Sequence, residues 1–328
     1  MMIGCTTAIE HWELVEPFEI AGQTYTTQDV VLVTLRDEQG RIGRGEAAGV
    51  DYDGETPAGM VREIAAVAPR LGQPLRGEDL LNLLPKGGAR NALDCALWDL
   101  RAKQTGLPAW RAAGLTSLDP LTTAFTLGLC DEAALRRKAR EARLFPLLKL
   151  KADAERHVDV VRIVREEHPR ARLVVDANQS WSRALLERLL PRLAALGVEL
   201  VEQPLPQGAD AELEGLQPVI PLAADESCRD RDSLPGLVGR YQYVNLKLDK
   251  CGGLTEALAM VREARRLGFG LMVGNMCGSS LAMAPAFLVG QYCRYVDLDG
   301  PLLQRRDREH PMRCEGGQMQ PPAAALWG

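Results

Sequence analysis

The sequence predicts an α/β protein in which a small α+β capping domain precedes a (β/α)7β barrel, a modified TIM barrel. Over residues 1–115, strand-like segments come before helical ones, which is typical of an α+β domain. From residue 116 onward, short apolar runs alternate with helical patterns, as a parallel sheet buried on both faces requires. Eight such runs with seven helices between them, in about 180 residues, match the size of a β/α barrel. The runs are 121–129, 147–151, 173–176, 199–203, 222–226, 243–248, 271–274 and 295–298.

The elements of the capping domain follow from local patterns. Alternating and β-branched residues predict strands, and apolar residues at helical spacing predict helices. A helix over 89–104 should end at Gly106, with Pro108 beyond it. The expected strands are 3–20, 29–36 and about 41–47, with a hairpin turn at 37–40; the other expected helices are 56–71 and 78–84. The barrel then fills residues 116–328, and its C-terminal tail is expected to pack back on the cap.

Composition bounds the class of protein. The 328 residues are 46% hydrophobic and 25% charged, as in globular proteins, and the net charge of −5 argues against nucleic-acid partners. The N-terminus resembles no secretory signal, and no apolar run is long enough to span a bilayer. None of the eight cysteines forms a C-x-x-C pair, so we expect reduced thiols in a cytoplasmic protein without a membrane partner. The oligomeric state, including a homo-oligomer, stays open.

Charged side chains recur at the ends of successive predicted barrel strands. Each lies one βα unit from the next, at separations of 25, 26, 23 and 22 residues. Residues at the same level of neighbouring barrel strands converge on one mouth, where active sites of this fold lie. We therefore expect an arc around that mouth, composed of Lys151, Asp176, Glu202, Asp225 and Lys247.

This arc predicts a metal site between two lysines. Three neighbouring carboxylates need a cation to remain ionised together, and oxygen-only ligands suit Mg²⁺. The competing interpretation is that each acid only caps the next helix. The flanking lysines should reach a ligand from opposite faces, and a lysine acts as a base only when its pKa is lowered. A second cation at Lys149 would favour neutral Lys151, and Asp249 is placed to hold Lys247.

Together these groups predict exchange of a proton next to a carboxylate. One lysine removes the α-proton, the metal stabilises the resulting enediolate, and the other lysine returns a proton to the opposite face. The outcome would be inversion of configuration.

The motifs around these residues resemble the enolase superfamily, muconate lactonizing enzyme subgroup. The resemblance covers nearly the whole chain, and residues 89–100 resemble that family's capping domain. It implies that Asp176, Glu202 and Asp225 bind Mg²⁺, that Lys151 and Lys247 are the acid/base pair, and that Asn178 and Asp249 lie behind them. The segments that carry it are Lys149–Lys151, Asp176–Asn178, Glu202–Pro204, Ala224–Ser227 and Asn245–Leu254.

Within that subgroup the chain is most similar to dipeptide epimerases, especially L-Ala-D/L-Glu epimerases. The telling segment is Asp297-Leu298-Asp299 at the eighth strand, where two carboxylates would bind the free ammonium group of a dipeptide. The alternative is a turn formed by Asp299-Gly300. The resemblance also implies substrate contacts from Lys149, Asn275 and Tyr25.

One segment departs from the Ala-Glu pattern. Residues 21–28 resemble the family's mobile specificity loop, which often carries an Arg for the distal carboxylate. Here the loop has no Arg or Lys, and Tyr25 can offer only a hydrogen bond. L-Ala-D/L-Glu is therefore the leading substrate prediction, and an apolar or aromatic dipeptide stays open.

Other activities remain as alternatives. A cycloisomerase, an o-succinylbenzoate synthase or an N-acylamino acid racemase would use the same lysines and metal, but its substrate would leave Asp297 and Asp299 without a cation. Acid-sugar dehydratases commonly need a His late in the barrel, and no His lies at a predicted strand end. Cys277 has no neighbouring His to activate it, so pocket lining is favoured over a nucleophile. A non-catalytic binding protein on a retained barrel is the alternative of a different class.

Overall fold

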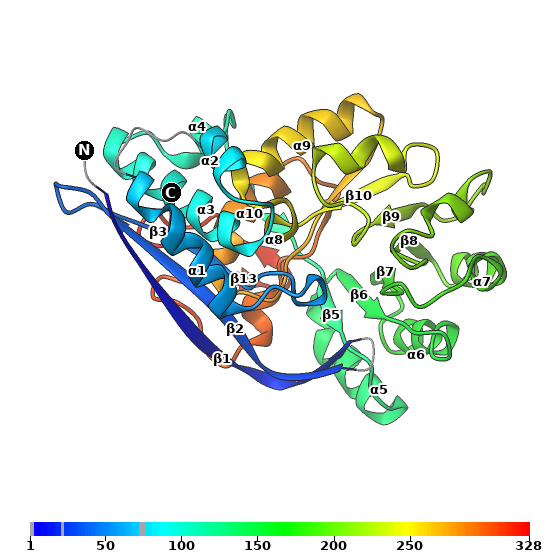
Figure 1. Cartoon of the computed structure of the whole chain (residues 1–328). Helices are drawn as coiled ribbons and strands as arrows, with labels where there is room; N and C mark the ends of the chain where they lie inside the picture. Colours follow the sequence, from blue (N-terminus) through cyan, green and yellow to red (C-terminus); the bar gives the residue numbers. More distant parts are fainter. Residues whose placement is uncertain (1–2, 21–22, 72–76) are drawn as a thin grey trace.

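The computed structural model describes residues 3–20, 23–71 and 77–328, and Figure 1 shows their arrangement. An antiparallel sheet, in the order β1-β2-β3, opens the chain. β1 and β2 form a long hairpin with a register shift between Glu13 and Phe18, where Pro17 cannot donate to the ladder. The predicted turn at 37–40 is confirmed, with Gly40 N donating to Asp37 O. The strands are β1 (Gly4–Ile20), β2 (Gln23–Arg36) and β3 (Ile42–Ala47).

β2 begins earlier than the sequence predicts. Residues 23–28, expected as part of a loop, pair with β1 through Phe18↔Tyr25 and Ile20↔Gln23. Residues 21 and 22 lie outside the described part of the chain. The described residues on either side of this gap therefore form a hairpin that extends from the cap sheet.

The helix α3 (Gly88–Thr105) packs directly against β3, and it ends as predicted at Gly106, which has φ 69°. Two glycines on β3 make this close approach possible. A Cβ on Gly45 would lie 2.0 Å from Ala92 O, and one on Gly43 would lie 2.3 Å from Ala96 O. The remaining cap helices are α1 (Pro57–Val67), η2 (Ala68–Arg70), α2 (Gly77–Leu83) and α4 (Ala109–Ala112), with η1 (Asp51–Asp53) before α1.

The second part of the chain is the predicted (β/α)7β barrel. Eight parallel strands follow one another in the order β12-β11-β10-β9-β8-β7-β6-β5. A parallel bridge between Thr123 and Val296, with Ala124 N donating to Val296 O at 2.7 Å, joins the two edges. The strands are β5 (Phe125–Leu127), β6 (Leu147–Lys151), β7 (Arg172–Asp176), β8 (Val198–Glu202), β9 (Leu222–Ala224), β10 (Tyr243–Leu246), β11 (Gly270–Val273) and β12 (Tyr295–Val296).

Two of the seven expected helices are short 3-10 segments instead. The links from β8 to β9 and from β9 to β10 contain η4 (Asp210–Leu213) and η5 (Arg231–Leu237). Both links are rich in Pro and Gly, which remove backbone donors and disfavour an α-helix. The other links contain α5 (Glu132–Glu141) with η3 (Ala142–Leu144), α6 (Val158–Glu167), α7 (Arg183–Ala195), α8 (Leu248–Cys251), α9 (Leu254–Arg266) and α10 (Ser280–Gly290).

The C-terminal segment contacts both parts of the fold. After η6 (Gly300–Leu303), the strands β13 (Cys314–Glu315) and β14 (Gln318–Met319) form a small antiparallel sheet with β4 (Leu121–Thr122). The last residues then reach the cap, where Trp327 Nε1 donates to Cys95 O and Gly328 N donates to Asp99. None of the described helices has the length and apolar character needed to cross a membrane.

Candidate active site

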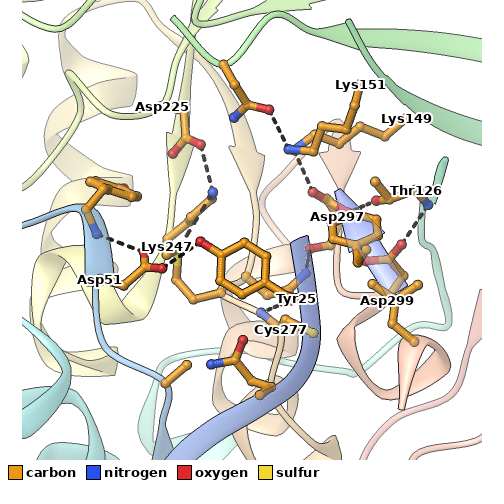
Figure 2. Close-up of a pocket in the computed structure, with 18 of the residues that line it drawn as sticks. Tyr25, Asp51, Thr126, Lys149, Lys151, Asp225, Lys247, Cys277, Asp297 and Asp299 are labelled. Atoms are coloured by element: carbon orange, nitrogen blue, oxygen red, sulfur yellow. Dashed lines mark hydrogen bonds and ion pairs between the residues drawn. The ribbon is translucent and has the colours of Figure 1, made fainter. Parts of the chain in front are cut away.

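A cavity of about 440 Å³ lies between the cap and the carboxyl ends of the barrel strands. The cap contributes hairpin and η1 residues to its walls, and the barrel contributes charged residues from the strand ends. Figure 2 shows how these side chains converge. The residues that line it include Tyr25, Asp51, Tyr52, Lys149, Lys151, Asn178, Gln179, Asp225, Glu226, Lys247, Asn275, Cys277, Asp297 and Asp299.

The three predicted metal ligands lie on three neighbouring strands, and each is fully buried. Each carboxylate has one oxygen held by the protein. Asp176 Oδ1 accepts from Asn178 N at 2.9 Å, and Glu202 Oε1 accepts from Asn245 Nδ2 at 2.7 Å. Asp225 Oδ1 accepts from Lys250 Nζ at 2.5 Å. Of the three acids, Asp225 is among the residues that line the cavity, and the second oxygen of each acid lies next to a lysine amino group.

Lysine amino groups contact those second oxygens. Lys149 lies 3.0 Å from Asp176 Oδ2 and 2.9 Å from Glu202 Oε2, while Lys151 lies 2.7 Å from Asp176 Oδ2. Lys247 lies 2.7 Å from Asp225 Oδ2. The contact with Glu202 Oε2 is an ion pair without hydrogen-bond geometry, because that buried oxygen has no hydrogen-bond partner among the described residues.

Burial and these ion pairs shift the pKa values in opposite directions. Burial raises the pKa of Glu202 to about 8, and Asp176 adds to the shift. Burial acts the same way on Asp176, but Lys149 and Lys151 together lower its pKa to about 2. Burial alone would lower the pKa of Lys247, yet Asp225 holds it above the usual range. Lys247 is thus held charged while it is paired with Asp225.

Lys149 was expected to be a second cation beside Lys151 and to contact substrate. Its amino group contacts three carboxylates, those of Asp176, Glu202 and, at 2.9 Å, Asp297. Although burial opposes it, the three carboxylates hold the pKa of Lys149 well above its usual value. Its positive charge is therefore compensated locally.

The two remaining lysines stand on opposite sides of the carboxylates. Lys151 ends β6 and Lys247 follows β10, so the three strands that bear or precede the acids separate them. Figure 2 shows them entering the pocket from opposite sides of the view. Asn178 Oδ1 accepts from Lys151 at 2.8 Å, so the predicted neighbour does contact this lysine.

Asp249 does not hold Lys247, and that prediction is wrong for the contacts of the described residues. Its Oδ1 accepts from Gly49 N of the cap at 2.9 Å, while Lys247 pairs with Asp225. Asp249 is the second residue of the short helix α8 (Leu248–Cys251), and its side chain points toward Gly49 of the cap. Burial raises the pKa of Asp249 to about 7.

The predicted ammonium site is buried and already hydrogen bonded. Asp297 pairs with Lys149, and its carbonyl accepts from Asn275 Nδ2 at 2.7 Å. Asp299 Oδ2 accepts from Thr126 N at 2.7 Å. Burial, followed by repulsion from Asp297, raises the pKa of Asp299 to about 7. The two acids differ, because Asp297 has a cationic partner in Lys149, whereas Asp299 is hydrogen bonded by Thr126.

The cap side of the cavity joins the hairpin to η1. Tyr25 OH donates to Asp51 at 2.8 Å, and Figure 2 shows the Tyr25 ring extending into the pocket. Tyr52 lines the same wall. The cap therefore completes the cavity above the barrel residues, with aromatic rings and a carboxylate.

The donor set fits a hard divalent cation, although no three acidic, Cys or His side chains of the described residues already surround one point as a ready metal site. Lysine amino groups contact the carboxylate oxygens that would bind the ion. Three carboxylate oxygens from the ends of adjacent strands form a donor set that suits Mg²⁺: Asp176 Oδ2, Glu202 Oε2 and Asp225 Oδ2. Of these, Glu202 Oε2 has no hydrogen-bond partner among the described residues. The residues present therefore fit the ion that the sequence predicts.

Comparison with known families agrees with this arrangement. Residues 131–325 match the family model described as enolase C-terminal domain-like, and residues 2–114 match the N-terminal domain of mandelate racemase and muconate lactonizing enzyme. The chain belongs to the enolase superfamily. The first model alone covers more than half of the 328 residues.

This enolase superfamily member has relatives of described activity. An L-Ala-D/L-Glu epimerase of Escherichia coli is 40% identical over 312 residues, 94% of this chain and 97% of the relative. An N-acetyl-D-glutamate racemase of Pseudoalteromonas is 46% identical over 250 residues, 76% of this chain and 79% of the relative. The chain is thus similar to proteins acting on a dipeptide and on an acylated amino acid.

Solved structures of the superfamily show the same fold. One from Agrobacterium tumefaciens, with homology to dipeptide epimerases and with bound sodium and L-Ala-L-Glu, has a TM-score of 0.95 and 41% identity, covering 99% of this chain and 100% of that chain. A dipeptide epimerase from Methylococcus capsulatus, complexed with Mg and L-Arg-D-Lys, has a TM-score of 0.91 and 32% identity, covering 98% of this chain and 97% of that chain.

Several site residues of this superfamily member were not singled out from the sequence. Lys250 and Asn245 hold carboxylate oxygens from behind, and Gln203 accepts from Asp225 N at 2.9 Å. Glu226 follows Asp225 and lines the cavity. The polar residues that follow each strand could have indicated these positions. Only the geometry of the barrel, however, shows which of them face inward.

Proposed function

We propose that the chain is a Mg²⁺-dependent dipeptide epimerase that exchanges the α-proton of the C-terminal residue of its substrate. The main support is the set of three buried carboxylates at the strand ends between Lys151 and Lys247. Each has one oxygen held by a hydrogen bond and the other next to a lysine amino group. Homologues named dipeptide epimerases and the superfamily's fold support this assignment. L-Ala-D/L-Glu is the leading substrate.

The proposed roles follow from the contacts of the described residues. Asp176, Glu202 and Asp225 would hold the ion with Oδ2, Oε2 and Oδ2. When bound, the ion would supply positive charge that offsets charge developing on the substrate carboxylate and that replaces the lysines as partner of the three acids. Asp297 and Asp299 would accept the ammonium group of the dipeptide.

The lysines would move the proton. Lys151 Nζ, held by Asn178 Oδ1, would take or give the α-proton on one face, and Lys247 Nζ would do so on the other. A lysine acts as a base only when neutral, and Lys247 can lose its charge more readily once Asp225 no longer pairs with it. Cap residues such as Tyr25 would exclude water from the anion formed between the two transfers.

A second candidate is racemisation of an N-acylated amino acid. It is favoured by the relative named N-acetyl-D-glutamate racemase and by the contacts of Asp297 and Asp299. Asp297 already pairs with Lys149, and a buried Asp299 with a raised pKa can be neutral beside an acyl group. The lysines and the metal would act as in the dipeptide reaction.

One experiment separates these candidates. The protein with Mg²⁺ is incubated in D₂O with L-Ala-L-Glu or with N-acetyl-L-glutamate, and loss of the α-proton signal is followed by NMR. The proposal expects exchange of L-Ala-L-Glu that stops when EDTA removes the ion. Exchange of N-acetyl-L-glutamate alone would establish the second candidate, and no exchange of any dipeptide or acylated acid would contradict both.

A further inference from the structure

Glu226 has a buried carboxylate oxygen that the described residues leave without a partner. The residue is 4% exposed and lines the cavity. Its Oε1 accepts from Gln179 Nε2 at 3.2 Å, whereas its Oε2 accepts no hydrogen bond from any residue that the structure describes. An unsatisfied buried acceptor costs about 1–3 kcal/mol, and more when it is charged. Such a group in a native site needs an explanation, and a missing donor is the simplest one.

Glu226 lies beside the proposed metal ligands. Glu226 directly follows Asp225, and Gln179, whose side-chain amide donates to Glu226 Oε1, lies three residues after Asp176. Asp176 ends β7 and Asp225 follows β9, so the two acids stand on either side of Glu202. Glu226 therefore connects the two strand ends that flank Glu202, and it lines the cavity.

The partner of Glu226, Gln179, lies in a strained stretch of backbone. Asn178 and Gln179 have φ of 41° and 67°, in the left-handed region that residues other than glycine rarely adopt. Gln179 is fixed on both sides, because its N donates to Gln203 O at 2.8 Å and its Oε1 accepts from Gln207 N at 2.8 Å. The amide of Gln179 is thereby directed at Glu226 Oε1, which leaves Oε2 as the free acceptor.

The donor that fits is water on the bound ion. Mg²⁺ prefers six oxygen ligands and usually keeps some of its waters. Three carboxylate oxygens and at most two oxygens of a substrate carboxylate leave at least one of about six positions for water. A water bound to a cation is a strong donor, and partners of metal ligands and waters typically contribute 10- to 100-fold to affinity. Two other buried oxygens near the site also lack a hydrogen-bond partner among the described residues, but they fit this water less well. Glu202 Oε2 is paired with Lys149, and Asn245 Oδ1 belongs to an uncharged amide.

We propose that Glu226 is a positioning residue for the magnesium ion, whose Oε2 accepts a hydrogen bond from a water on that ion. This inference rests on the proposed function, because it needs the ion that Asp176, Glu202 and Asp225 would hold. Glu226 touches the ion through water and exchanges no proton with the substrate. Its negative charge and its acceptor oxygen both favour the loaded state over the empty one.

The test is Mg²⁺ binding to the whole protein without substrate, measured by equilibrium dialysis. E226Q keeps the size of the side chain and removes the charge, so its Kd for Mg²⁺ should rise about 10- to 100-fold. In EDTA its melting temperature should equal or exceed that of the parent, because an unpaired buried charge has been removed. A structural role would lower that melting temperature. The matched control is D51N, which changes a carboxylate on the cap wall of the same cavity and should leave the Mg²⁺ Kd within about twofold.

Each outcome has a clear meaning. E226Q with the parent's Mg²⁺ affinity, or with weaker affinity only alongside a lower melting temperature in EDTA, would overturn the inference and leave the proposed function intact. A parent protein that binds no Mg²⁺ would overturn the proposed metal and this inference together. If E226Q does not fold, Q179A carries the test: it frees Glu226 Oε1, it should weaken Mg²⁺ binding several-fold, and unchanged affinity would overturn the inference.

Discussion

Replacing Asp94 with Asn should stabilise the protein at neutral pH. Asp94 lies on α3 of the cap, is fully buried and accepts from Thr255 N at 2.9 Å and Thr255 Oγ1 at 2.6 Å on the barrel helix α9. Burial raises its pKa to about 6 from an ordinary 3.8, and the bonds from Thr255 only partly oppose this shift. The folded state therefore binds this proton more tightly than the unfolded state, so stability is full below the unfolded pKa and falls as pH rises through 3.8 to about 6.

The magnitude follows from the size of the shift. At 1.36 kcal/mol per pKa unit, this shift lowers the free energy of unfolding, relative to its value at low pH, by about 3 kcal/mol at pH 8 and by about 1.5 kcal/mol at pH 5. D94N has no such cost, because its amide oxygen can accept from Thr255 N while its Nδ2 donates to the Thr255 hydroxyl, which can also act as an acceptor. Thermal unfolding at both pH values should show D94N more stable than the parent at pH 8, with a smaller gain at pH 5.

Asp99 provides the matched control on the same helix. It is also buried, but its oxygens accept from Arg44 N, Lys103 Nζ and Gly328 N, each at 2.8 Å. All three partners of Asp99 can only donate, so the Nδ2 of an Asn would face a donor, and D99N should lower the melting temperature at both pH values. A D94N protein that is less stable than the parent at pH 8, or whose gain is larger at pH 5, would refute the reasoning.

Two further changes test the site and the fold. N245L removes the donor to Glu202 Oε1 and should raise the Mg²⁺ Kd about 10- to 100-fold in equilibrium dialysis, so an unchanged Kd would show that Glu202 needs no such support. G45A places a methyl group 2.0 Å from Ala92 O and should destabilise the cap by about 3 kcal/mol or more, whereas G236A, with open space around it, should leave the melting temperature nearly unchanged. Equal melting temperatures for the two glycine variants would contradict the close packing of β3 on α3.

The barrel strands could be predicted because a parallel sheet covered on both faces needs continuous apolar runs. Charged residues such as Lys151 and Asp176 mark the points where these runs end. The links around η4 and η5 were mistaken for α-helices, because their apolar residues have suitable spacing while their Pro and Gly residues decide the outcome. Residues 23–28 were missed as strand since a hairpin projecting from a sheet is not required to alternate apolar and polar residues.

The site was predictable only at the level of strand ends. One residue per βα unit must reach the same mouth, which is why Asp176, Glu202 and Asp225 meet. The direction of a side chain one or two positions beyond a strand depends on the local turn. Asp249 turns to Gly49 in the cap, and Glu226 turns into the cavity, and spacing alone distinguishes neither. Lys149 on β6 contacts Asp297, which follows β12 far along the chain, so this contact could be found only from the closed barrel.

The placement of Lys151 and Lys247 on opposite sides of the substrate is tested most directly by single-lysine variants. K151A and K247A are each incubated with Mg²⁺ in D₂O and with either epimer, L-Ala-L-Glu or L-Ala-D-Glu, and α-proton exchange is followed by NMR. Each variant should exchange the proton of one epimer only, and the two variants should retain opposite epimers. Retention of the same epimer by both variants would place the two amino groups on one face and contradict the account.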